Sequence, residues 1–288
     1  MKEFISHFSA AAIWEIPYLE SVLGYEIAKA IAADITVSEH EARYRNNGRR
    51  VHSCERDMPV DAVKSRNGKI VASPELLFLE LACKLSIHKL ILMGLQMCSH
   101  PLGDPSGAIT TKQKLKTFLA KTSGHWGHKN AARAMQYIEN GSASVMESIA
   151  YMILALPHAL GGYGLDGAVF NHEIKLKNGS DRRLGQKSCF TDLYYEHARI
   201  AVEYDSFLHH NSPSEQGRDM VRSAILERHG IRMMHLSTIQ LYDKDACMDF
   251  AFILAARLGK RIHIRAKRFD EMHVLLRTLL PTSQKQVD

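Results

Sequence analysis

The stretch FTDLYYEHARIAVEYD, residues 190–205, decides the fold of the second half of the chain. Apolar and polar residues alternate on both sides of a polar turn at 196–198, which is typical of a β-hairpin. If the hairpin is symmetric about this turn, Asp192 lies directly opposite Glu203, with Cβ atoms about 4.5–5.5 Å apart. Asp205 projects from the same face because side chains alternate along a strand. The spacing therefore predicts three carboxylates on one face.

Crowded carboxylates repel one another, and each raises the pKa of its neighbours. A fold tolerates them if a cation lies between them, and hard oxygen ligands favour Mg²⁺ or Mn²⁺ over zinc. Such an ion polarises a phosphate and generates hydroxide near neutral pH. The alternative is a solvated hairpin face on which Arg199 or Arg222 neutralises the acids. Spacing alone leaves both interpretations open.

Three further residues are candidates for the chemistry of this hairpin. Glu147 is a possible fourth ligand, but the sequence 144–147, Ser-Val-Met-Glu, is also a capping box, in which the glutamate bonds the amide of the N-cap residue. His209 and His210 follow the second hairpin strand. A neutral imidazole acts as a general base or contacts phosphate near pH 7. The alternative for this histidine pair is a surface loop.

Basic residues near the hairpin and near the C-terminus are candidates for contacts with DNA. Arg218 and Arg222 lie at helical spacing, which suits either an exposed ion pair with Asp219 or contacts with phosphates. Lys260 and Arg261 begin a basic run that could neutralise backbone phosphates. The alternative for that run is a solvated helix face.

The hairpin belongs to a longer pattern over residues 141–288. Helices are expected at about 145–155, 215–229 and 245–258, and strands at 169–177, 190–195, 199–205 and 231–236. The order α-β-β-β-α-β-α suits a mixed central sheet flanked by helices. We therefore expect an α+β fold in this zone.

Two other zones precede it. Residues 1–72 contain turn signals between short strand candidates at 35–38, 50–53 and 70–72, and indicate a small β-rich module. Residues 73–140 form a helical connecting region. Its first helix begins at Ser73-Pro74, with serine as N-cap and proline at the first helical position.

Composition excludes several classes of protein. The 288 residues are 45% hydrophobic and 24% charged, which is typical of a globular chain. Apolar runs reach only about ten residues, so we expect no membrane span and a cytoplasmic protein. Five scattered cysteines without a CxxC pair argue against disulfides and a cysteine zinc site. The net charge of +6 permits a polyanionic partner such as DNA without identifying one.

Residues 191–195, 200–206 and His209 resemble the PD-(D/E)XK nuclease superfamily, and most closely its very-short-patch-repair-endonuclease branch. The likeness extends over residues 218–222 and 226–232, and residues 144–147 look like the helix that opens that domain. It implies a restriction-endonuclease-like α-β-β-β-α-β core with a mixed central sheet. It also implies metal-dependent cleavage of DNA, with Mg²⁺ or Mn²⁺ held by Asp192 and Glu203.

One residue departs from the superfamily pattern. A lysine is expected two residues after the glutamate, and Asp205 stands there. The very-short-patch branch also lacks this lysine, which implies that His209 or His210 takes its part. The departure supports an alternative function, a catalytically inactive nuclease-fold protein that binds its partner as a regulator or antitoxin-like component.

The N-terminal zones resemble a different family. Residues 6–11, 51–52 and 72–75 are similar to the middle of AbiEi-type abortive-infection proteins, many of which fuse such a segment to a nuclease-like domain. The resemblance implies a setting in phage defence and a protein partner from the same locus.

Overall fold

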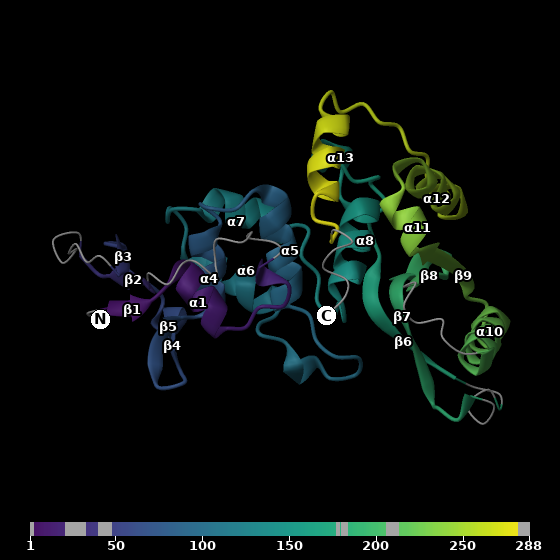
Figure 1. Ribbon diagram of the computed structural model, residues 1–288, viewed down its shortest axis with the longest axis horizontal. Coiled ribbons are helices and arrows are strands. Elements are labelled where there is room, and N and C mark those ends of the chain that lie inside the picture. Colours follow the sequence, from purple (N-terminus) through teal and green to yellow (C-terminus); the bar gives the residue numbers. More distant parts are fainter. Residues whose placement is uncertain are drawn as a thin grey trace. The chain divides into compact units, whose positions relative to one another are not determined.

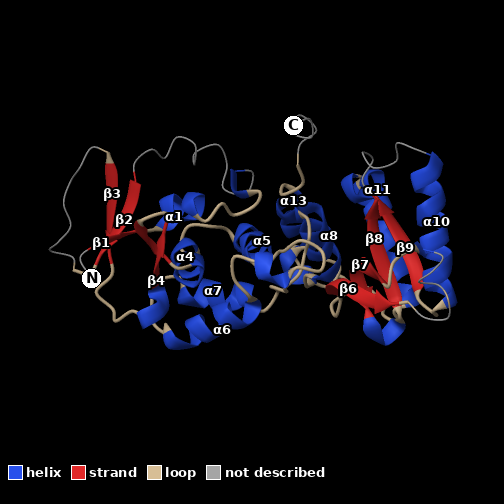
Figure 2. Ribbon diagram, turned by 90° about the horizontal axis from the view of Figure 1, so that it is seen from below, coloured by secondary structure: helices blue, strands red, loops and turns tan. Residues whose placement is uncertain are grey.

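The computed structural model describes residues 3–20, 33–39, 48–176, 179, 184–205 and 213–281. The chain forms two compact units: unit 1 is Met1–His100 with Pro105–Asn140, and unit 2 is Pro101–Asp104 with Gly141–Asp288. Each unit combines a mixed β-sheet with helices (Figures 1 and 2), so the fold is α+β. No helix in these ranges is both long enough and apolar enough to cross a bilayer.

Within the described residues, unit 1 has a five-stranded sheet with the order β3-β2-β1-β5-β4. The strands are β1 (Glu3–Ile5), β2 (Ala33–Val37), β3 (Arg49–Ser53), β4 (Val63–Arg66) and β5 (Lys69–Ala72). The first strand lies in the middle, antiparallel to β2 and parallel to β5. The sequence predicted β2, β3 and β5 but neither β4 nor β1, and the partners of β1 come from distant parts of the chain.

The α-helices whose bounds lie within the described residues of unit 1 are α1 (His7–Ile13), α4 (Pro74–Leu81), α5 (Ile87–Met97), α6 (Lys112–Lys121) and α7 (His128–Met135). Helix α4 is central and packs against the other four. Its predicted start is confirmed, because the Ser73 side chain accepts the amide of Leu76 at 3.2 Å and Pro74 is the first helical residue. The apolar residues of α4 are buried on most of its surface, which makes it the core of the unit.

The sheet of unit 2 has the order β6-β7-β8-β9 among the described residues. Its strands are β6 (Val169–Lys175), β7 (Ser188–Tyr195), β8 (Ile200–Asp205) and β9 (Arg232–Ser237). The first three run antiparallel, and β9 is parallel to β8. Helix α8 (Val145–Ala155) lies on one side of the sheet and α10 (Pro213–Arg228) on the other, as Figure 2 shows.

The hairpin of β7 and β8 has the predicted symmetric register, with Leu193 opposite Val202 and Tyr195 opposite Ile200. Both faces of the hairpin are covered. Tyr194 and Ala201 pack in one apolar cluster with Ile225 and Leu226 of α10, and Val202 on the opposite face is also buried. The face that carries the three acids is therefore turned toward α10 rather than toward solvent.

The C-terminal part of unit 2 adds α11 (Thr238–Tyr242), α12 (Lys244–Arg257) and α13 (Phe269–Arg277). Helix α13 was not predicted from the sequence. It packs on the segment that follows α8, where the imidazole Nδ1 of His273 donates to the carbonyl of Gly161 at 2.7 Å. Gly161 has a φ of 78°, and a Cβ there would lie 2.4 Å from the backbone nitrogen of His273. Only glycine permits this approach.

We expect Gly161→Ala to destabilise unit 2 by about 3 kcal/mol or more, because the methyl group adds a clash with α13 to the cost of a left-handed backbone. Gly167→Ala is the matched control: its φ is 95°, but nothing lies within 4 Å of the added Cβ. It should cost only about 1 kcal/mol. Denaturant unfolding followed by circular dichroism measures both. Equal losses for the two variants would show that α13 does not constrain residue 161.

Candidate active site

Asp192 and Glu203 lie on adjacent strands at the end of the hairpin ladder. The ladder pairs Leu193 with Val202, so the next facing pair in this register is Asp192 with Glu203. The Oδ2 of Asp192 accepts the amide of Tyr204 at 2.8 Å, which ties the carboxylate to β8 beside Glu203. The sequence prediction placed these two acids together, and this hydrogen bond keeps Asp192 at that position.

Both acids are removed from water. The side chain of Glu203 is only 10% exposed. Burial raises the pKa of Asp192 well above its ordinary value, and the charges of Glu203 and Glu147 raise it further. Burial also raises the pKa of Glu203, while the charge of Arg222 opposes that rise. The alternative of a solvated face neutralised by Arg199 or Arg222 therefore holds only in part: Glu203 is buried rather than solvated, but Arg222 does pair with it.

Arg222 supplies the positive charge of this cluster. Its Nη2 lies 3.0 Å from Oε1 of Glu203 and also donates to the carbonyl of Phe190. Arg199, the other proposed neutraliser, lies elsewhere: its guanidinium donates to the carbonyls of His229 and Gly230 at the end of α10. Thus α10 brings a guanidinium to Glu203, and the Asp192 carboxylate keeps its raised pKa.

Glu147 lies near the pair but is already hydrogen-bonded. Ser144 caps α8 through the amide of Glu147 at 3.1 Å, as the capping-box pattern predicts. The Oε2 of Glu147 accepts the amide of Ala143 at 2.9 Å and the side-chain amide of Asn171 at 2.8 Å. Asn171, between two paired positions of β6, has a φ of 45°. Glu147 is therefore held in place by more than the cap, and its charge acts on Asp192.

Asp205 pairs with a residue that the sequence analysis missed. The Nδ1 of His235 lies 3.0 Å from Oδ2 of Asp205, and the parallel register sets His235 beside Glu203. The bond to Asp205 is the largest cause that raises the pKa of His235, so the imidazole favours its charged form. The local signal for His235 in the sequence is its place as a polar residue between a buried methionine and a buried leucine of β9. This signal is informative only once β9 is known to lie beside β8.

The remaining candidates are dispersed. His209 and His210 fall outside the described residues. Arg218 is exposed on α10. Lys260 lies after α12, in a segment without helix or strand, where its Nζ is 2.5 Å from Oδ1 of Asp166. Arg261 follows it and is exposed, so the alternative that placed this run on a helix face is wrong for both residues.

The donor set suits a hard cation held by few protein ligands. In the described parts of the chain, no three His, Cys, Asp or Glu side chains form a group that could hold a metal ion. Mg²⁺ usually takes one or two carboxylates, with water and substrate phosphate completing its shell. Two carboxylates that are largely shielded from water, both with a raised pKa, fit that requirement. Neither a protein-family model, nor a curated protein, nor a solved structure matches the chain.

The raised pKa of Asp192 makes a prediction about stability in metal-free buffer. In the folded protein this carboxyl keeps its proton above its ordinary pKa of 3.8, where the unfolded chain has lost it. The free energy of unfolding must therefore fall as pH rises from about 4 through the folded pKa. Asp192→Asn removes the ionisation and keeps the acceptor for Tyr204. We expect it to raise the melting temperature near pH 8 in EDTA, with little effect below about pH 4.

Asp205→Asn is the control for this experiment. Asp205 is 32% exposed and loses its ion pair with His235 on substitution, so it should give no gain at pH 8. If Asp192→Asn lowers the melting temperature at every pH, the carboxylate is stabilised by partners in the fold and is not a strained charge.

Proposed function

We propose that unit 2 is a PD-(D/E)XK-like nuclease module that hydrolyses phosphodiester bonds of DNA with Mg²⁺ or Mn²⁺. The order α8-β6-β7-β8-α10-β9 is the one that the resemblance implies, which supports the assignment of a restriction-endonuclease-like core. Fold alone does not establish activity. The proposal therefore depends on the residues at the end of the hairpin.

The observation that carries the proposal is the burial of two facing carboxylates. Asp192 and Glu203 are held in a low-dielectric position where burial raises the pKa of both. Such an arrangement costs folding free energy, and a fold that keeps it gains a high-affinity position for a cation. The site lies where the β7–β8 ladder ends, and the backbones of both strands fix the two side chains.

In this proposal each residue of the site has a separate role. Asp192 and Glu203 hold the cation, which, when bound, supplies Lewis acidity toward the phosphate and lowers the pKa of bound water. Glu147 holds the start of α8 and adds negative charge near Asp192. His235, charged beside Asp205, is positioned to contact a phosphate oxygen or to donate a proton to the leaving oxygen.

The first test is cleavage. The purified chain should cut DNA with Mn²⁺ or Mg²⁺, and EDTA should stop it. Asp192→Asn and Glu203→Gln should each reduce the rate at least about a hundredfold, because a metal contributes several kcal/mol and each 1.4 kcal/mol is tenfold. Glutamine keeps an oxygen for Arg222, so the fold should persist. Glu173→Gln, an exposed position of β6, is the matched control and should leave the rate unchanged.

A second function has its own supporting observation. Arg222 already lies 3.0 Å from Glu203, at the place where a cation would bind this carboxylate. Asp205, which stands where the motif has lysine, is engaged with His235. These ion pairs favour the alternative of a catalytically inactive nuclease-fold protein that binds DNA or a protein partner as a regulator in a defence locus.

Arg222→Gln separates the two functions. If Arg222 competes with a cation for Glu203, its removal should tighten Mn²⁺ binding about tenfold, because the local net charge becomes more negative. Isothermal titration calorimetry of the full chain measures this directly. In the inactive alternative neither the parent nor the variant binds Mn²⁺, and Arg222→Gln only lowers the melting temperature, since Glu203 loses its partner.

A further inference from the structure

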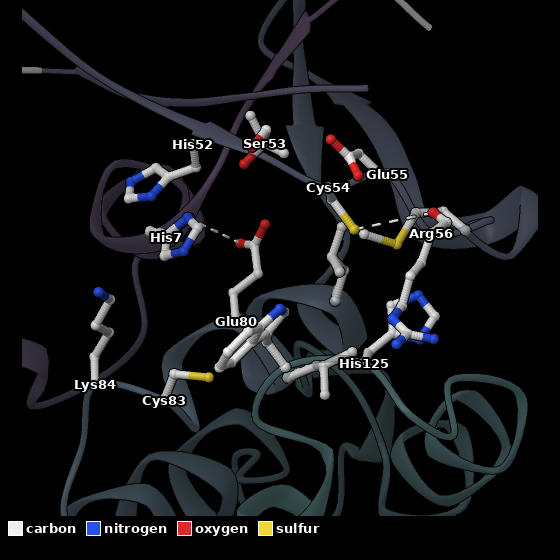
Figure 3. A pocket seen from close by; sticks show the side chains of 15 residues that line it. His7, His52, Ser53, Cys54, Glu55, Arg56, Glu80, Cys83, Lys84 and His125 are labelled. Atoms are coloured by element: carbon white, nitrogen blue, oxygen red, sulfur yellow. Dashed lines mark hydrogen bonds and ion pairs between the residues drawn. The ribbon is translucent and has the colours of Figure 1, made fainter. Parts of the chain in front are cut away.

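Unit 1 contains a cavity of about 600 Å³ that the function proposed for unit 2 does not use. Figure 3 shows its lining, which combines side chains of β3 and the segment after it, of α4, and of the loop before α7. Cavities of this size hold small organic ligands. Its wall mixes apolar side chains such as Leu76 and Met58 with charged and hydrogen-bonding groups.

Two glycines allow the loop before α7 to pack closely against the other walls of the cavity. Gly127, with a φ of 84°, lies so close to α4 that a Cβ there would be 2.5 Å from the carbonyl oxygen of Leu79. Gly124, with a φ of 82°, lies beside the guanidinium of Arg56, since a Cβ at this position would be 3.3 Å from Nη1. The loop that carries His125 and Trp126 is therefore fixed over the end of α4.

Trp126 lines this cavity while 88% of it is exposed. Burial of an indole is strongly favourable, so an exposed indole gains free energy when a ligand covers it. Trp14, the other tryptophan, is engaged: its Nε1 donates to the carbonyl of Ala72 at 2.8 Å, and the guanidinium of Arg66 lies over its ring. Trp126 thus offers a stacking surface for a planar ligand.

Two polar groups of the wall have hydrogen-bonding capacity for a ligand. The Nδ1 of His125 lies 3.0 Å from the carbonyl of Thr122 and must donate to it, which leaves Nε2 as an acceptor. That Nε2 is buried and has no partner among the described residues. Burial raises the pKa of Glu80 to about 8, so at neutral pH this carboxyl carries a proton that it can donate. Its Oε2 accepts the amide of His7 at 2.9 Å.

Neutral and charged groups alternate around the wall of the cavity, with Lys84 and Arg56 on opposite sides of it (Figure 3). His7 stacks on His52 with ring centroids 3.8 Å apart, and burial lowers the pKa of His7 to about 3, so this imidazole is neutral. The φ of His7 is 48°, a strained value of the kind found at ligand sites. Lys84 and Arg56 supply positive charge at other points of the wall, and Glu55 is the acid of the segment after β3.

We propose that this cavity binds a nucleotide, with its base stacked on Trp126 and its phosphate near Lys84. A heteroaromatic base presents N–H donors to an acceptor such as Nε2 of His125, and acceptors to a protonated carboxyl such as Glu80. The phosphate of the nucleotide requires a cation, which Lys84 supplies. The nucleotide comes either from the free pool or from a single strand of nucleic acid, and the chemistry is the same for both. The site does not depend on the function proposed for unit 2.

The test uses the full-length chain with Trp14→Phe, so that Trp126 is the only tryptophan. Titration with the 5′-monophosphates of adenosine, guanosine, cytidine and uridine should quench its fluorescence saturably, and at least one should bind more tightly than its nucleoside. In the parent chain, calorimetry should show that Trp126→Ala weakens binding roughly tenfold to a hundredfold and that Trp126→Phe restores most of it. Lys84→Met should make nucleoside and nucleotide bind alike.

Phe252→Ala, which removes an exposed aromatic residue of α12, is the control and should change nothing. Binding of the mononucleotides assigns the free pool as the source. Binding of only a short single-stranded DNA, still sensitive to Trp126→Ala, assigns a strand. If no probe binds the folded chain, or if binding is indifferent to both Trp126→Ala and Lys84→Met, the proposal is overturned.

Discussion

Two carboxylates that are largely shielded from water set the main constraint on unit 2. Asp192 and Glu203 face each other across a hairpin that α10 covers, and each needs a proton, a cation or a hydrogen-bond donor. Arg222 meets this need for Glu203, and the amide of Tyr204 meets part of it for Asp192. The position of α10, the side chains at the end of β8 and the chemistry open to the site all depend on how this negative charge is balanced.

The parts of the fold that were predictable have local signals. The hairpin was predicted with its register because the turn at 196–198 joins two strands with clear alternation, and β7 pairs with β8 as expected. The start of α4 followed from Ser73-Pro74. The central place of β1 was not predictable, since Ile5 pairs with Val71 across a long sequence separation that leaves no periodic trace. Helix α13 was not predicted, and the last helix expected from the sequence was the one at about 245–258.

The residues of the candidate site were likewise predictable only where the signal is local. Asp192 and Glu203 were found because both lie on one hairpin, where spacing determines geometry. The partner of Glu203 could not be chosen, because Arg199 and Arg222 are equally plausible in sequence and only the packing of α10 distinguishes them. His235 was missed since its neighbour Asp205 lies on a strand whose parallel pairing arises only through α10. Longer-range pairing is a property of the assembled sheet rather than of any segment.

The hydrogen bond between His273 and Gly161 can form only late in the synthesis of the chain. The two residues are 112 positions apart, and Arg277 at the end of α13 donates to the carbonyls of Leu241 and Tyr242. At about 5–20 residues per second, a ribosome needs on the order of ten seconds to pass from one partner of the first bond to the other. During that interval α8, whose residues 149–154 are buried in the finished unit, has no α13 to cover it. A nascent chain of this protein therefore leaves the part of α8 that α13 covers exposed until α13 has been synthesised.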